Sequence, residues 1–231
     1  MYGRALQLDE HLPNALLGLA DVLSARVMDG FSDTPEIDLR HAEELVSKAL
    51  AVDPNSWHAH LTKDNILRAQ KHYEKAIAEF ETVIALNPNT VNGRSHLARA
   101  KIFIGEPADA IPLLEQAMKI SPRHPGIGYL HYRLGLANLL LGNVDEAIRW
   151  YEKAALTYYE PAHAYLQLGA AFGLKGDKAA AQVALAEAVK RRPDYATIAG
   201  VRKHSISNRP KFVELREQTI IDGLRKAGLP E

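Results

Sequence analysis

The chain repeats itself every 34 residues. Pro54, Pro88 and Pro122 follow one another at intervals of 34, and the same interval leads from Tyr159 to Pro193. Each interval holds two apolar patterns of helical spacing joined by a short turn. Units of this length form helix-turn-helix stacks, in which each unit buries its apolar face against its neighbours. The period therefore predicts an all-α fold, a right-handed superhelical solenoid.

Small, large and turn-forming residues recur at fixed places within the interval. One position of each helix is small, and its members are Ala98, Gly135 and Gly169 in the first helices and Ala110, Ala147 and Ala181 in the second. Small residues allow two helix backbones to approach closely. The large residues that fill the gap to the next unit are Phe80, Leu114, Tyr151 and Leu185. Gly105, Gly142 and Gly176 are expected at the turns, where glycine tolerates positive φ.

This register resembles the tetratricopeptide repeat, whose pattern is W-x2-L-G-x2-Y…A-x3-F…P over 34 residues. The resemblance covers about residues 1–195 and implies a scaffold that binds other proteins. Two strings, ISPRHP at 120–125 and GLRKAGLPE at 223–231, also resemble the C-terminal repeat regions of bacterial adenylate/guanylate cyclase-like regulatory proteins. That narrower resemblance implies the regulatory part of a larger signalling protein.

The register divides the chain into three predicted parts. Residues 1–12 read as the second helix of a truncated repeat, and residues 13–195 as a solenoid of about five repeats (13–56, 57–90, 91–127, 128–161 and 162–195). Residues 196–231 read as a linker and a capping helix over about 210–226 that covers the open end of the stack. Because Tyr2, Leu6 and Leu8 lack a preceding unit, we expect the natural protein to extend upstream.

Two places depart from the regular pattern. The first repeat carries ten extra residues, predicted as a loop over about Met28–Asp38, with Thr34 or Asp38 capping the next helix. The repeat at 57–90 has Asp64 where its siblings have glycine or alanine. An unpartnered buried carboxylate is costly. The favoured interpretation is therefore an exposed Asp64 on a shifted helix, and the alternative is a buried Asp64 that meets a cation or a backbone donor.

Composition limits the function classes. The 28 basic and 28 acidic residues cancel, so no global charge favours nucleic acid or a membrane surface. The sequence has no cysteine, which suits a reducing cytoplasm and leaves no thiolate for metal or catalysis. His58 and His60 are two residues apart and so point to different faces of a helix. We expect no metal, no cofactor, no membrane contact and no enzyme activity in this chain.

The resemblance implies that the first helix of each pair lines the concave surface where partners bind. One face of these helices, followed at spacings of three and four, is polar early in the chain and aromatic or aliphatic later. The candidate partner-binding residues are Asn65, Arg68, Asn92, Ser95, Arg99, Tyr129, Tyr132 and His163. Tyrosine and arginine are residue types that often dominate interface energies.

The sequence is compatible with three functions. The first is a non-catalytic scaffold that binds a protein or peptide partner in the concave groove. The second is a self-association module, in which the apolar late groove is buried against another copy or against the chain's own tail. The third and weakest is nucleic-acid binding through the basic stretch from Lys190 to Lys211, because α-solenoids that read RNA use regular side-chain sets that this sequence lacks.

Overall fold

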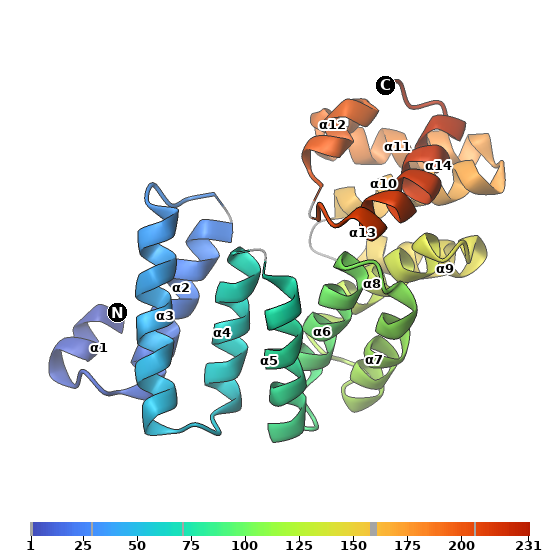
Figure 1. Ribbon diagram of the computed structural model, residues 1–231. Coiled ribbons are helices and arrows are strands. Elements are labelled where there is room, and N and C mark those ends of the chain that lie inside the picture. The colour runs from blue at the N-terminus through green and yellow to red at the C-terminus, as the bar shows by residue number, and fades with distance from the viewer. Residues whose placement is uncertain (1, 29, 71, 158–160, 206) are drawn as a thin grey trace. The chain divides into compact units, whose positions relative to one another are not determined.

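The fold is helical throughout the part of the chain that the structure describes. The computed structural model describes residues 2–28, 30–70, 72–157, 161–205 and 207–231, and these form helices and connecting turns without a strand (Figure 1). The chain divides into two compact units, Met1–Ala100 and Lys101–Glu231. Within the described residues, no helix is both long and apolar enough to cross a membrane.

Unit 1 contains paired helices around an aliphatic core. Its helices are α1 (Tyr2–Leu8), α2 (Pro13–Met28), α3 (Pro35–Val52), α4 (Trp57–Ala69), α5 (Tyr73–Leu86) and most of α6 (Val91–Phe103). Helix α2 packs against α3 and α4, and α4 packs against α5. The core includes Leu16, Leu17, Ala20, Ala42 and Val46, all at most 2% exposed. The short α1 packs on α2, with Leu6 against this core.

The predicted loop over Met28–Asp38 is wrong in its extent. Helix α2 continues to Met28 and α3 begins at Pro35, so the extra residues lengthen the two helices to 16 and 18 residues. The physical reason is that proline suits the first turn of a helix, where its missing N–H is not needed. Thr34 occupies the N-cap position, but its side chain accepts no capping hydrogen bond. Instead, Ser32 Oγ accepts from Thr34 N at 3.2 Å and donates to Asp38 Oδ2 at 2.7 Å.

Unit 2 repeats the paired arrangement of helices. Its helices are the end of α6, α7 (Pro107–Ile120), α8 (Ile127–Leu140), α9 (Val144–Thr157), α10 (Pro161–Lys175) and α11 (Lys178–Arg191), followed by η1 (Pro193–Ala196), α12 (Ile198–Lys203), α13 (Pro210–Arg216), η2 (Glu217–Ile221) and α14 (Asp222–Lys226). The predicted turn glycines are confirmed, since Gly105, Gly142 and Gly176 have φ of +87°, +80° and +84°.

The predicted small positions are also confirmed in unit 2. A Cβ on Gly135 would lie 2.7 Å from the Tyr151 ring, and one on Gly169 would lie 2.6 Å from Leu185 Cδ2. Both distances are too short for a real Cβ, so these two positions require glycine unless the neighbour shifts. The sequence register therefore placed the close helix contacts of α8 with α9 and of α10 with α11 correctly.

The C-terminal helix forms where it was predicted but lies elsewhere in the fold. Residues 210–226 form α13, η2 and α14, and we call this segment the tail helix. It contacts the first helices rather than the end of the stack: η2 packs on α8 and α10, and α14 packs on α10. The end after α11 is instead contacted by η1, which also contacts α12. The reason is a pair of glycines, Gly173 and Gly223, that lets α14 cross α10 closely.

Candidate functional site

A line of hydrogen-bonded polar side chains crosses three successive first helices in unit 1. Asn65 Nδ2 on α4 donates to Asp21 Oδ1 on α2 at 3.1 Å, and Asn65 Oδ1 accepts from Arg68 Nη1 at 3.3 Å. Arg68 Nη1 also lies 2.9 Å from Nδ1 of His96 on α6. All four side chains are partly exposed. We call Asp21, Asn65, Arg68 and His96 the polar row.

Arg68 is held in the polar row by several contacts. Its Nη2 lies 3.2 Å from the sulfur of Met28, and its Nη1 lies 3.9 Å from Asp64 Oδ2. The imidazole of His96 also stacks on the Phe80 ring, with centroids 5.6 Å apart. Only 11% of the Arg68 side chain is exposed, so the guanidinium is fixed at the surface with little freedom to reorient. Such a fixed donor costs little entropy when it meets a ligand.

Asp64 is buried, which overturns the favoured interpretation of an exposed carboxylate on a shifted helix. Its side chain is fully buried, and neither carboxylate oxygen has a hydrogen-bond partner among the described residues. Desolvation raises the pKa of Asp64 to about 8, although the nearby Arg68 charge opposes that rise. Desolvation likewise lowers the pKa of Arg68, against the attraction of Asp64. The structure thus has the buried Asp64 near a cation that the sequence analysis gave as its alternative. The effect of desolvation on the pKa of Asp64 is larger than that of the Arg68 charge.

The other predicted residues of unit 1 lie on α6 and differ in exposure. Asn92 is exposed, Arg99 is partly exposed, and Ser95 is buried with 5% of its surface accessible. The sequence reasoning missed His96, which falls one position beside the face that contains Ser95. His96 belongs to the row because the long Arg68 side chain extends from α4 to contact it. Helical periodicity does not predict such a contact between side chains of two helices.

A line of aromatic rings crosses α8, α10 and the segment after α11 in unit 2. Tyr132 on α8 and His163 on α10 have centroids 6.3 Å apart, and His163 is 5.7 Å from Tyr195 in η1. Tyr195 in turn is 5.7 Å from His204, which follows α12. Each of these contacts is edge-to-face, a favourable geometry for aromatic pairs. We call Tyr132, His163, Tyr195 and His204 the aromatic row.

The structure brings two of the candidate residues, Tyr132 and His163, together, whereas the sequence analysis did not name Tyr195 and His204. Both missed residues lie beyond Pro193, where the 34-residue register ends, so periodicity gave no signal. Tyr129, also predicted, lies one turn from Tyr132, and the Arg133 guanidinium is 5.6 Å from the centroid of its ring. Tyr132 and His163 are partly exposed, while Tyr195 is buried.

Charged groups surround the outer end of the aromatic row. The imidazole of His204 contacts the Asp194 carboxylate, and Arg192 Nη2 lies 3.3 Å from Asp194 Oδ2. Desolvation acts to raise the pKa of Asp194, but hydrogen bonds and charges from His204 and Arg192 lower it overall. The Arg192 guanidinium also lies over the Tyr195 ring at 4.8 Å. This end of the row therefore combines an aromatic face with fixed charges of both signs.

Sequence comparison identifies the repeat. Residues 95–161 match one family model of the tetratricopeptide repeat, and residues 65–90 and 162–195 match a second model with the same description. Together these matches span more than half of the chain. The chain belongs to the tetratricopeptide-repeat family. No curated protein sequence matches it.

Solved structures share the tetratricopeptide fold over most of the chain. PilF of Pseudomonas aeruginosa is similar at 14% identity with a TM-score of 0.68, covering 95% of this chain and 96% of its own. PilW, described as a widely conserved type IV pilus biogenesis factor, is similar at 15% identity with a TM-score of 0.67, covering 90% of this chain and 96% of its own. YrrB, described as having an unusual peptide-binding site, is similar at 18% identity with a TM-score of 0.61, covering 88% of this chain and 97% of its own. At these identities the similarity establishes the fold alone.

The late part of the predicted tetratricopeptide groove is covered in unit 2. Leu136, Leu139 and Ala170, from the face that the sequence assigned to the groove, are at most 4% exposed. They lie on α8 and α10, the two helices that η2 contacts. Of the two coverings left open by the sequence, the chain's own tail packs on these two helices within unit 2. The aromatic row and the covered stretch are therefore two parts of one face of the first helices.

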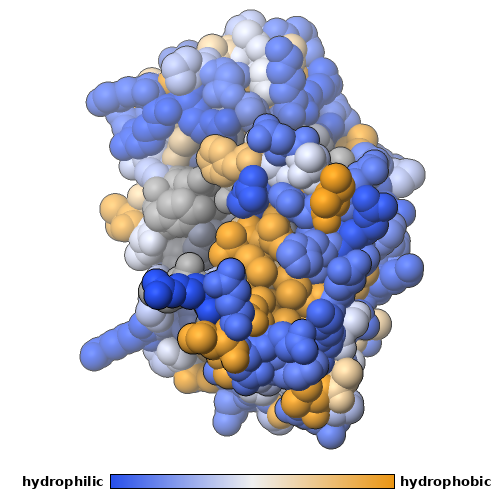
Figure 2. All heavy atoms as spheres, turned by 90° about the vertical axis from the view of Figure 1, so that its left-hand side faces the viewer, coloured by the Kyte–Doolittle hydropathy of each residue, from blue (hydrophilic) through white to orange (hydrophobic). Residues whose placement is uncertain are grey.

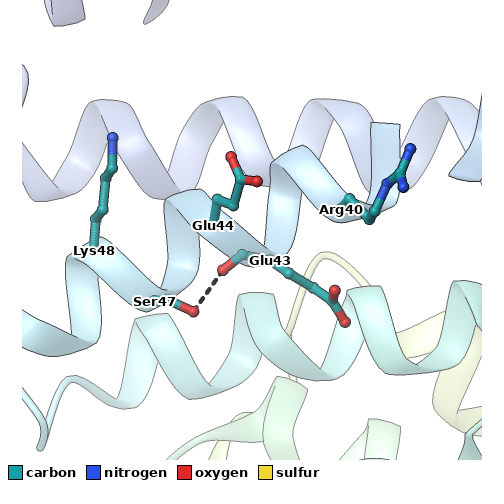
Figure 3. A pocket seen from close by; sticks show the side chains of 5 residues that line it. All are labelled: Arg40, Glu43, Glu44, Ser47 and Lys48. Carbon is teal, nitrogen blue, oxygen red and sulfur yellow. Dashed lines mark hydrogen bonds between the residues drawn. The ribbon is translucent and has the colours of Figure 1, made fainter. Parts of the chain in front are cut away.

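A shallow hollow on the second helix of the first tetratricopeptide pair does not form a site. It is lined by Arg40, Glu43, Glu44, Ser47 and Lys48, all from α3 (Figure 3). Glu44 and Lys48 point to one side of the helix and Glu43 to another, and Ser47 Oγ donates to the Glu43 backbone oxygen at 2.8 Å. Side chains that diverge from a single helix cannot converge on a ligand. Among the described residues, no cluster of three potential metal ligands is present.

Proposed function

We propose that this chain is a protein-interaction scaffold that binds a peptide segment of its partner along the first helices. Tetratricopeptide proteins are generally interaction scaffolds, and the known structures that share this fold include one described by its peptide-binding site. In this proposal the polar row of unit 1 and the aromatic row of unit 2 are each a contact surface for a partner peptide, and the second helices are not. The proposal assigns binding rather than catalysis, and a cytoplasmic location that suits a chain without cysteine.

The polar row is the observation that carries the proposal. Stacking of helical repeats needs apolar contacts, so a polar line that runs across three first helices has no structural requirement behind it. Asn65 and Arg68 are fixed by their neighbours before any ligand arrives, at 3.1 and 3.3 Å. Fixed polar groups with exposed edges are suited to the amides and carboxylates of a peptide.

Selection from a random peptide library on the immobilised chain tests the proposal. Affinities of the selected peptides are then measured for the parent and for Asn65→Ala and Tyr132→Ala. We expect at least one of the two groove variants to weaken each selected peptide about tenfold, the size expected for an interface anchor. Circular dichroism of each variant checks that the helices remain.

Matched controls come from the exposed second helices, Glu81→Ala on α5 and Glu115→Ala on α7. Glu79 is not a suitable control because it contacts His60 and Lys63, each at 2.6 Å. If the control variants weaken binding and the groove variants do not, the partner binds the outer surface and the proposal is wrong.

We further propose that the chain is the regulatory part of a larger signalling protein. The strings at 120–125 and 223–231 support this, because they resemble the repeat regions of bacterial cyclase-like regulators. The residue division into a truncated repeat, a solenoid over 13–195 and a C-terminal segment belongs to the same proposal. Determination of the natural open reading frame tests it: a contiguous effector domain is expected, and a frame limited to these residues would contradict it.

Self-association is a second candidate, favoured by apolar surface on unit 1. Leu8, Leu12 and Val22 are 87%, 39% and 45% exposed on or beside α1 and α2. Figure 2 shows apolar surface gathered at the centre of the face that it displays, within a hydrophilic rim. Sedimentation velocity at several concentrations tests this function, with Val22→Asp expected to lower any association and the exposed Glu81→Ala to leave it unchanged.

A further inference from the structure

The tail helix lies on unit 2 much as a bound helical ligand would lie. It begins beside the end of α6, where the Phe212 ring contacts Phe103 edge-to-face with centroids 5.7 Å apart. It then continues along α8 and α10 through η2 and ends on α10 through α14. Phe212, Ile220 and Leu224 are at most 3% exposed. The tail helix thus crosses the first helices of three successive pairs, the surface that a partner would use.

Two glycines lie where the tail helix crosses α10. We call the surface of unit 2 that the tail helix covers the seat. A Cβ on Gly173 of α10 would lie 2.0 Å from the backbone oxygen of Gly223, and a Cβ on Gly223 would lie 2.2 Å from the backbone oxygen of Ala170. Backbone atoms cannot move aside as a flexible side chain can. The seat therefore accepts a helix that has glycine at the crossing, and it excludes a helix with a larger residue there.

The described residues that connect α12 to the tail helix, 204, 205 and 207–209, are not helical. Ser205 and Asn208 are exposed, whereas the buried Ser207 Oγ donates to the backbone oxygen of Phe103 at 2.7 Å. Two further polar contacts join this C-terminal segment to α12, the surface ion pair of Arg202 with Glu217 at 2.6 Å and the Ile198 backbone N–H, which donates to the Pro230 backbone oxygen at 2.7 Å. Surface ion pairs of this kind contribute little to stability. A helix held mainly by one apolar seat can leave it as a unit.

We propose that the face of α6, α8 and α10 in unit 2 is a helix-binding site, that the tail helix is its internal ligand, and that a partner helix of the same chemistry competes for it. The tail itself specifies that chemistry: an amphipathic helix with an aromatic residue eleven positions before a glycine, as Phe212 stands before Gly223. This inference deepens the proposed function, since it names a helix as the partner for the covered part of the groove.

A labelled synthetic peptide with the sequence of residues 208–231 tests the proposal. It is titrated against the full chain and against the full chain with Gly223→Leu, which prevents the internal tail from seating. The peptide is expected to bind the Gly223→Leu chain at least tenfold more tightly than the parent, whose seat is filled. A chain with Gly173→Leu, which blocks the seat itself, is expected to bind the peptide no better than the parent.

Controls separate this inference from the proposed function. Ala199→Leu adds the same side chain at an exposed position of α12 and should leave peptide binding at the parental level. Equal binding to the parent and to Gly223→Leu, or none to a folded Gly223→Leu chain, would overturn the helix-binding site. That result would not bear on the proposed function. The proposed function is tested separately, by the effect of Asn65→Ala on the affinity of the library-selected peptides.

A milder variant covers the case in which Gly223→Leu unfolds the chain. Phe212→Ala removes the ring contact with Phe103 without adding atoms, and it should raise peptide affinity severalfold over the parent. Native-state hydrogen exchange of the parent gives a third reading: residues 210–226 should open together while α8 and α10 stay protected. If these residues exchange only with the whole of unit 2, the tail is a fixed part of the fold and the proposal is wrong.

Discussion

The helix pairs α4/α5 and α10/α11 share a register but differ at one position of the first helix, the small position that faces a large residue of the second helix. We call this position the slot. In each pair, a residue of the first helix stands sixteen positions before a large residue of the second: Asp64 before Phe80, and Gly169 before Leu185. At Gly169 the helices are so close that an added Cβ would lie 2.6 Å from Leu185. In the other pair the slot contains a carboxyl group that is fully buried.

The difference shows what a tetratricopeptide stack requires in order to accept an acid at this position. Asp64 has Arg68 four residues later, with the nearest charged atoms 3.9 Å apart, and its pKa is raised to about 8. At neutral pH the acid is therefore mostly protonated and the slot holds a neutral group. Four residues after Gly169 stands Gly173, which supplies no charge. The Arg68 charge opposes that protonation, so the slot accepts the acid chiefly because the carboxyl group keeps its proton.

Placing an acid in the glycine slot should have the largest effect. Gly169→Asp puts a carboxylate against Leu185 with no cation four residues later, and burial of an unpaired charge costs about 3–5 kcal/mol of unfolding free energy. The cost should be greatest at pH 8 and smaller near pH 4, where about half of the unfolded chains also keep the proton on this acid. Urea unfolding at the two pH values measures it.

Gly169→Asn is the matched control, since it adds the same volume without a charge. Overpacking alone costs about 1–3 kcal/mol and should not change between pH 4 and pH 8. The comparison between the two slots fails if the aspartate and asparagine variants lose the same free energy at pH 8.

The pH dependence of the natural acid is the second prediction. The folded chain keeps the Asp64 proton up to a pKa of about 8, whereas the unfolded chain releases it near pH 4. Stability from this group is therefore fully present below pH 4 and is lost as the pH rises to 8, by at most about 1.4 kcal/mol per pH unit. Asp64→Asn cannot release a proton, so its stability should exceed that of the parent increasingly across this range.

The measurement is the difference in unfolding free energy between the parent and Asp64→Asn at pH 4, 6 and 8. We expect that difference to grow by a few kcal/mol, on the order of what such a shift implies. Glu81→Gln, at an exposed position of α5, is the control for general charge effects. Parallel profiles for the parent and Asp64→Asn would show that Asp64 is ionised in the fold.

The contrast between the two pairs also explains which features the sequence could predict. The glycine turns and the small slots depend on residues within one repeat, so the 34-residue register located Gly142, Gly169 and Gly176 correctly. The burial of Asp64 was missed because an exposed charge was taken as the cheaper outcome. A carboxyl group can instead become neutral by keeping its proton, and that choice depends on surroundings that a sequence does not display.

The candidate site was predictable only where it follows the repeat. Tyr132 and His163 meet because their positions recur on neighbouring first helices. The seat of the tail helix depends on the contact of Ser207 with Phe103, 104 residues away, and on the crossing of Gly173 with Gly223. Neither pair has a periodic relation, and a lone glycine in a helix has many uses. The tail was therefore predicted as a helix but assigned to the wrong surface.

The smallest effect concerns the helix starts, where the two pairs differ again. Asp177 is the N-cap of α11, and its side chain accepts a hydrogen bond from Ala180 N at 3.0 Å. His72, at the same register position before α5, makes no side-chain cap hydrogen bond. His72→Asp should therefore raise the unfolding free energy by about 1 kcal/mol, and Asp177→Ala should lower it by about the same amount. Asp177→Asn keeps an accepting oxygen and should lose little, which separates the hydrogen bond from the charge that also favours a helix N-terminus. Chemical unfolding, with hydrogen exchange of α5 to localise the gain, measures all three. If His72→Asp leaves α5 unchanged, the weaker start of that helix does not come from the missing cap.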